Sequence, residues 1–162
     1  MPRKAFTVDE ANALIPLLEQ ALRQIADRRA AIRERTDKLQ VLDAIWGAGV
    51  AARSNPDHGE YLEHRAEIAR AVADVQRLVN DEIMARGLRF PVGGLEHGLI
   101  DFPTTFEGRW IYLCWHSPEP RVEAWHEVNG GFAGRRVLTT SDAPRMGLAD
   151  DPARLDDSVL DF

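Results

Sequence analysis

An apolar repeat in the first third of the chain constrains the fold more than any other feature. Apolar residues recur there at alternating steps of four and three, with Arg28 and Arg35 as two polar interruptions. This spacing is typical of a coiled-coil seam and predicts one long helix over residues 6–47. The apolar positions of the repeat are Leu14, Leu18, Ala21, Ile25, Ile32, Leu39, Leu42 and Trp46.

The start of this helix is marked by a second signal. Thr7 followed three residues later by Glu10 forms a capping box, in which each side chain bonds the other residue's backbone N–H. Pro16 then falls inside the pattern and removes one backbone donor. We therefore expect a kink at Pro16, or a short first turn followed by a restart.

A second helix is predicted over residues 60–86, after a break rich in glycine and proline at residues 47–59. Gly87 is placed to end it in a left-handed conformation. Two helices joined in this way predict a long antiparallel hairpin. Because the first helix is the longer one, part of its seam is left over, and a second copy of the chain is the simplest partner for a homodimer.

The rest of the chain to residue 138 alternates and is rich in aromatic residues, which predicts a small antiparallel β module over residues 99–138. A strand in "LIDFP" is expected to stop at Pro103. "RWIYLCWH" reads as a central strand, and "RVEAWHEV" as its partner across the turn "SPEP". The fold class is therefore α+β, with residues 1–138 as a single domain.

The charge and composition of the chain indicate its expected location and partners. The net charge of −6 and the absence of a nucleic-acid motif make nucleic acid an unlikely partner. With one cysteine, no signal sequence and no apolar span, the chain is expected to be cytoplasmic and without a membrane partner. Residues 139–162 are rich in aspartate and are predicted to form a flexible acidic tail whose last residues, including Phe162, could dock on a protein partner.

A four-residue turn at "SPEP" fixes a register for the two strands and sorts their side chains. It places opposite one another the pairs His116 and Arg121, Cys114 and Glu123, Tyr112 and Trp125, and Trp110 and Glu127. Cys114 and His126 then lie on opposite faces. A metal site would then be restricted to Cys114, His116 and Glu123. Three ligands of different types without a second cysteine are a weak signal for a metal, so we expect no bound metal and no cofactor.

Two further groups of residues have a chemical interpretation. His126 on an apolar face is expected to bond a buried acid such as Asp101, a pair that could act as a general base and its orienting group. An alternative is a ligand pocket with aromatic walls and polar anchors, formed by Trp110, Tyr112, Trp125, Glu127 and Arg135.

Three stretches carry a resemblance to a known family. "FTVDEANALIPLL", "GLIDFP" and "YLCWHSPEPRVEAWHEVNGGFAGRR" occur in the order found in the bacterial family known as domain of unknown function 2203, over about residues 6–138. The resemblance implies no activity, cofactor or catalytic residue. It places the following residues at motif positions: Asp101, Cys114, Trp115, Glu119, Trp125, His126, Phe132, Gly134 and Arg135.

The sequence thus favours a non-enzymatic structural or interaction protein that self-associates through its helical hairpin. The alternative is an enzyme or a metal-binding protein that uses His126, Asp101 and Cys114.

Overall fold

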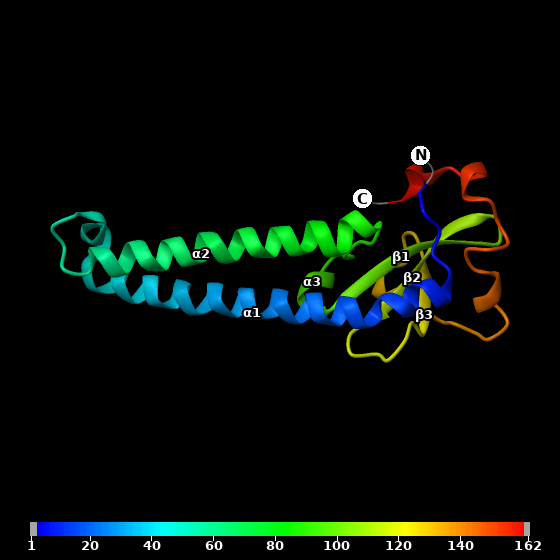
Figure 1. Cartoon of the computed structure of the whole chain (residues 1–162), viewed down its shortest axis with the longest axis horizontal. Helices are drawn as coiled ribbons and strands as arrows, with labels where there is room; N and C mark the ends of the chain where they lie inside the picture. Colours follow the sequence, from blue (N-terminus) through cyan, green and yellow to red (C-terminus); the bar gives the residue numbers. More distant parts are fainter. Residues whose placement is uncertain (1–2, 161–162) are drawn as a thin grey trace. The chain divides into compact units, whose positions relative to one another are not determined.

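A computed structural model describes residues 3–160, which form two compact units. One unit combines the residues up to Gln20 with those from Asp81 onward, and the other is Ala21–Asn80. The first helix, α1 (Val8–Trp46), contributes residues to both. Long helices and a four-stranded antiparallel sheet confirm the predicted α+β class (Figure 1).

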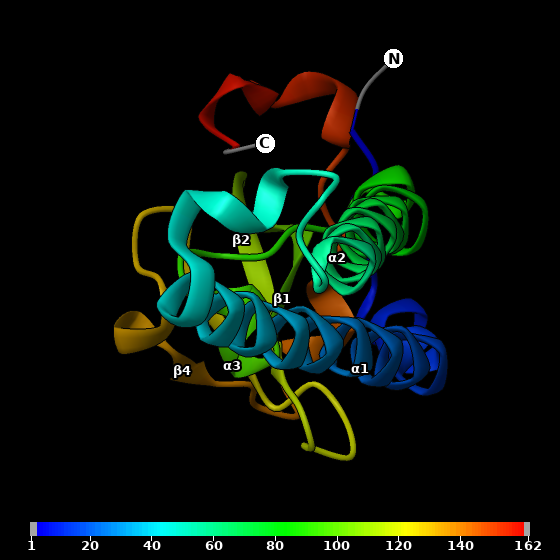
Figure 2. The same cartoon turned by 90° about the vertical axis from the view of Figure 1, so that its left-hand side faces the viewer.

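Residues 21–80 form a pair of antiparallel helices. The second helix, α2 (His58–Leu78), follows a 3₁₀ turn at Gly47–Ala51 and lies beside α1 (Figure 2). Arg28 forms an ion pair with Asp74 at 3.2 Å, and Arg35 donates to His64 Nδ1 at 3.0 Å. The two arginines that interrupt the apolar repeat therefore pair across the helices. The buried residues of this unit are Ala21, Ile25, Leu42, Val50, His64, Ala71 and Leu78.

The second helix ends close to its predicted limit, through a change of helix type. A π-helical stretch, Val79–Ile83, and a 3₁₀ turn, Met84–Arg86, lead to Gly87. Gly87 has φ 85°, the left-handed conformation expected of a helix-terminating glycine.

The first turns of α1 belong to the unit that contains the sheet. Thr7 N donates to Glu10 Oε2 at 2.9 Å and Glu10 N to Thr7 Oγ1 at 3.1 Å, as the capping box predicts. The helix continues through Pro16 without a restart. Its apolar face is buried in the sheet's unit at Ala11, Ile15 and Leu18. The extra length of α1 is therefore buried within the same chain. Helix length is thus no longer a reason to expect a second copy.

The sheet has the order β1-β2-β3-β4, with every neighbouring pair antiparallel. The strands are β1 (Leu99–Phe106), β2 (Arg109–His116), β3 (Ala124–Glu127) and β4 (Arg136–Val137), and a short helix, α3 (Gly94–His97), precedes them.

Pro103 does not end the first strand, contrary to the prediction. β1 is an edge strand, and the backbone of Pro103 faces away from β2, where its carbonyl accepts from Phe6 N at 2.9 Å. The missing N–H of proline therefore costs no bond between strands. The same edge is covered at Asp101 by a bridge to Arg89, and at Thr105 by a bond from Gly147 N.

The register between β2 and β3 differs by one residue from the predicted one. Cys114 pairs with Ala124 instead of Glu123, and Tyr112 pairs with His126 instead of Trp125. The connection runs from residue 117 to residue 123, longer than a four-residue turn. Because a shift of one residue moves every side chain to the other face, the predicted separation of Cys114 from His126 is wrong.

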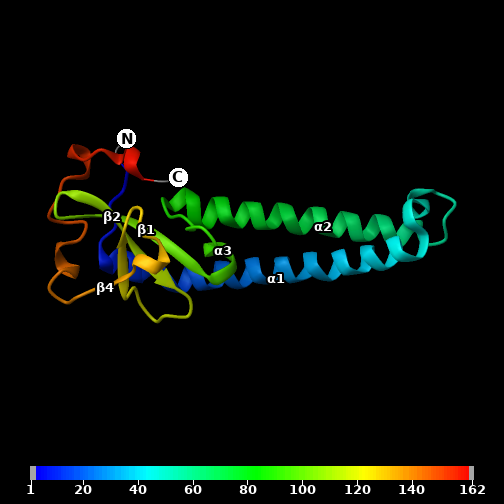
Figure 3. The ribbon, with the colours of Figure 1, turned by 180° about the vertical axis from the view of Figure 1, so that it is seen from behind.

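The sequence predicts a flexible tail from residue 139, but residues 139–160, named here the C-terminal segment, pack on the sheet. Met146 and Leu160 are buried, and Asp150 accepts from Gly108 N in the β1–β2 turn at 3.1 Å. Figure 3 shows this segment, orange to red, passing that turn. Phe162 lies outside the described residues. Within residues 3–160, none of the helices has the length and apolar character required to cross a bilayer.

Candidate metal centre

Three buried side chains from adjacent strands converge on one face of the sheet. Asp101 on β1 lies directly opposite Cys114 on β2, and His126 on β3 lies opposite Tyr112, two residues along β2 from Cys114. One ligand atom from each of Asp101, Cys114 and His126 lies within 4.8 Å of the other two. All three residues are at most 1% exposed. The observed register brings together the residues that the predicted register separates.

The contacts of His126 determine its protonation. Its Nδ1 lies 2.7 Å from the backbone oxygen of Glu127, and its Nε2 lies 3.1 Å from Oδ1 of Asp101. A carbonyl oxygen only accepts, so Nδ1 carries a proton and Nε2 faces the carboxylate. Burial, the largest single influence, lowers the pKa of His126, but the hydrogen bond and charge of Asp101 outweigh it, so that the pKa is raised above its ordinary value. The predicted His126–Asp101 hydrogen bond is present.

Arg89 completes the contacts of the Asp101 carboxylate. Its Nε and Nη2 both lie 3.2 Å from Oδ2 of Asp101, and the two backbones exchange hydrogen bonds of 2.9 and 3.2 Å. The guanidinium also lies 3.9 Å from the centre of the Tyr112 ring. Sequence reasoning did not single out Arg89. The only signal for it was its place in a short alternating stretch after Gly87.

The thiol of Cys114 is protonated at neutral pH. Burial, followed by the charge of Asp101, raises its pKa to about 12, and its side chain is hydrogen-bonded to Asp101. Both ring nitrogens of His126 are already occupied by Glu127 and Asp101, so neither is available to remove the thiol proton. The three residues therefore do not form a cysteine nucleophile with its base, because a thiolate is required for attack.

Two of the predicted metal ligands lie outside this group. His116 stacks edge-on against Phe132, with 5.7 Å between ring centres. Glu123 is exposed and lies 3.9 Å from Arg121. Among residues 3–160, the group of potential ligands identified by geometry is Asp101, Cys114 and His126.

Arg135 joins β2 to the β2–β3 connection at the end of the sheet. Its Nη2 donates to Glu119 Oε1 at 2.7 Å and to the backbone oxygen of Cys114 at 3.1 Å. Glu119 also accepts from His116 N at 2.8 Å, and its carbonyl accepts from Trp115 Nε1 at 2.8 Å. Glu119 thus fixes the β2–β3 connection whose length sets the register.

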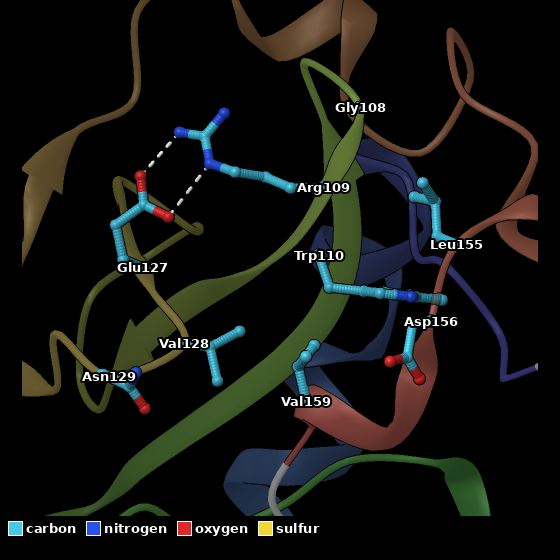
Figure 4. A pocket seen from close by; sticks show the side chains of 9 residues that line it. All are labelled: Gly108, Arg109, Trp110, Glu127, Val128, Asn129, Leu155, Asp156 and Val159. Carbon is cyan, nitrogen blue, oxygen red and sulfur yellow. Dashed lines mark hydrogen bonds and ion pairs between the residues drawn. The ribbon is translucent and has the colours of Figure 1, made fainter.

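The residues predicted to form one ligand pocket are divided by the sheet. Trp110 and Glu127 line one cavity of about 390 Å³ (Figure 4). Tyr112 is buried beside the ring of His126, with 5.6 Å between ring centres. Trp125 points to the opposite face, where it packs edge-on against Phe106. Since Arg135 is occupied by Glu119, these five residues do not surround a single ligand.

The remaining property of the Asp101–Cys114–His126 cluster is its donor set. Carboxylate oxygen, thiol sulfur and imidazole nitrogen are the three ligand types that bind zinc in proteins. A purely structural hydrogen-bond network also accounts for the three buried residues, because the Asp101 carboxylate accepts from each of its neighbours.

Comparison with known proteins places the chain in a family. Neither curated proteins nor solved structures give a match. A family model for uncharacterized conserved proteins matches residues 4–138, which include the whole cluster and end before the C-terminal segment. The chain therefore belongs to the DUF2203 family of uncharacterized conserved proteins.

Proposed function

We propose that this protein binds a divalent transition-metal ion of the zinc class through Asp101 Oδ1, Cys114 Sγ and His126 Nε2. The observation that carries the proposal is the convergence of these three ligands within 4.8 Å in a fully buried position. Ligands around one tetrahedral zinc ion lie at comparable separations, because each is about 2.0–2.3 Å from the metal.

The neighbours of the cluster support this proposal, since they leave one atom of each ligand for the metal. The carbonyl of Glu127 holds Nδ1 of His126, an outer contact that orients many zinc-bound histidines. Arg89 holds Oδ2 of Asp101, so Oδ1 is the oxygen available to an ion.

Charge balance gives further support. A divalent ion that replaces the proton on Cys114 Sγ and the proton on His126 Nε2 leaves the total charge of the group unchanged. A buried site is sensitive to this balance, because uncompensated charge in a low dielectric is costly. Binding would release protons, as expected for a site that contains a thiol.

Three protein ligands leave one position of a tetrahedral ion for water or a small ligand. Sites with three protein ligands are typical of catalytic zinc, in which the ion acts as a Lewis acid on the bound molecule. A zinc ion with one open position fits an enzyme or a metal-binding protein better than a purely structural protein.

The test is metal stoichiometry in the purified full-length protein and in matched variants. Wild type, Cys114→Ser and His126→Gln would be stripped with a chelator, reloaded with zinc or cobalt, and measured by elemental analysis and absorption spectroscopy. His116→Ala and Glu123→Gln serve as controls, since both residues are potential ligands that lie outside the cluster.

We expect one ion per chain in wild type and in both controls, and a cobalt–thiolate charge-transfer band that disappears in Cys114→Ser. Zinc should raise the melting temperature of wild type but not that of Cys114→Ser. If reloaded wild type holds no ion and zinc leaves its melting temperature unchanged, the cluster is a structural network and the proposal is wrong.

A further inference from the structure

A second site lies where the third strand ends before the second. The β2–β3 pairing stops at Ile111 and Glu127, so the backbones of Arg109 and Trp110 are not paired with β3. The C-terminal segment lies over this open edge and leaves the cavity of about 390 Å³ (Figure 4). This volume is within the usual range for small-molecule sites.

Apolar side chains from both sides line the cavity. Val128 follows β3, while Leu155 and Val159 come from the C-terminal segment. The same region of the segment buries Leu160 against Trp110 and Tyr112. A ligand in this cavity would therefore need a short apolar part.

The charges in the cavity leave one carboxylate available. Arg109 donates twice to Glu127, at 2.6 and 3.0 Å, so these two charges neutralise each other. Asp156 also lines the cavity, and its carboxylate accepts from the backbone N of Ser158 at 2.9 Å. No ion pair joins Asp156 to a basic side chain of residues 3–160. The free charge of the cavity is negative, which favours a cationic ligand.

Trp110 supplies a hydrogen-bond donor without an acceptor. It is 3% exposed, and within the described part of the chain its buried Nε1 has no partner. Figure 4 shows the indole extending between Leu155 and Asp156. Because an unsatisfied buried N–H is unfavourable, an acceptor oxygen beside the indole would be stabilised there.

We infer that this cavity binds a small amino alcohol with a short apolar chain. The ammonium group pairs with Asp156, the hydroxyl oxygen accepts from Trp110 Nε1, and the alkyl chain contacts Val128, Leu155 and Val159. This site is independent of the metal site, and the two can be tested separately.

The test is titration of the full-length protein with four probes of similar size: leucinol, isoamylamine, isocaproate and leucine. Binding is followed by the indole N–H signals in proton–nitrogen correlation spectra, with the signal of Trp110 assigned from Trp110→Phe. Asp156→Asn removes the proposed anchor, and Asp157→Asn is the matched control, a neighbouring carboxylate outside the cavity lining.

Leucinol should give saturable binding and move the Trp110 indole signal downfield, while isoamylamine binds without that downfield shift. Asp156→Asn should weaken leucinol binding by about threefold, the effect of one exposed ion pair, and Asp157→Asn should not. Isocaproate and leucine, which carry a carboxylate, should bind more weakly than leucinol. The inference is overturned if leucinol does not saturate, if isocaproate binds as well as leucinol, or if Asp156→Asn has no effect.

Discussion

At the scale of single residues, His126 shows how burial and one neighbour act against each other. The ring is fully buried, which disfavours its charged form, yet Asp101 at 3.1 Å and the carbonyl of Glu127 at 2.7 Å both favour that form. Their joint effect is the larger one, and the pKa of His126 is raised. In the metal-free protein, this histidine therefore links stability to pH.

The sign of this dependence follows from the raised pKa. Protonated His126 stabilises the fold fully below its unfolded pKa, ordinarily 6.5, and the stabilisation is lost as pH rises through the folded value. We expect chelator-treated wild type to lose unfolding free energy above about pH 6.5 relative to His126→Gln. Denaturant titrations between pH 5.5 and 9 would check this. Parallel curves for the two proteins would show that His126 has the same pKa in the folded and unfolded states, which would contradict the raised value.

At the scale of elements, local signals in the sequence predicted the helices and strands but not the register of the sheet. The capping box at Thr7 and Glu10 and the terminating Gly87 depend on nearest neighbours, and both are confirmed. The β2–β3 register depends on the connection between the strands, in which Glu119 bonds the nearby His116 N and also Arg135, which is distant in sequence. A difference of one residue in the register decides which side chains of β2 and β3 share a face. The His126–Asp101 pair was predictable, whereas the position of Cys114 beside it was not.

The C-terminal segment shows that amino-acid composition alone does not determine whether a segment packs. Its aspartates predict an unpacked tail, but its few apolar residues find places on the sheet, with Met146 and Leu160 buried. Met146→Ala should lower the unfolding free energy by about 2 kcal/mol, because it removes a fully buried side chain. Leu148→Ala, at a 69% exposed position, should change it by less than about 0.5 kcal/mol. Urea unfolding of both variants would decide, and equal values would contradict the packing of the segment.

At the scale of the whole molecule, the proposed metal site and α2 belong to different compact units. Asp101, Cys114 and His126 lie in the unit that contains the sheet, and α2 lies in the unit of residues 21–80. A ligand stabilises the structure that binds it. Zinc should therefore slow amide hydrogen exchange in β1, β2 and β3 far more than in α2. Exchange followed by mass spectrometry would detect this, and equal protection of α2 would show that the two units open together.

The most direct test of the metal centre uses the single cysteine of the chain. X-ray absorption of the zinc-loaded protein counts the sulfur atoms bound to the ion, and one chain can supply only one thiolate sulfur. We expect one sulfur at about 2.3 Å and the remaining ligands, nitrogen or oxygen, at about 2.0–2.2 Å. A zinc ion without sulfur, or with two sulfur atoms drawn from separate chains, would contradict the proposed Asp101–Cys114–His126 site.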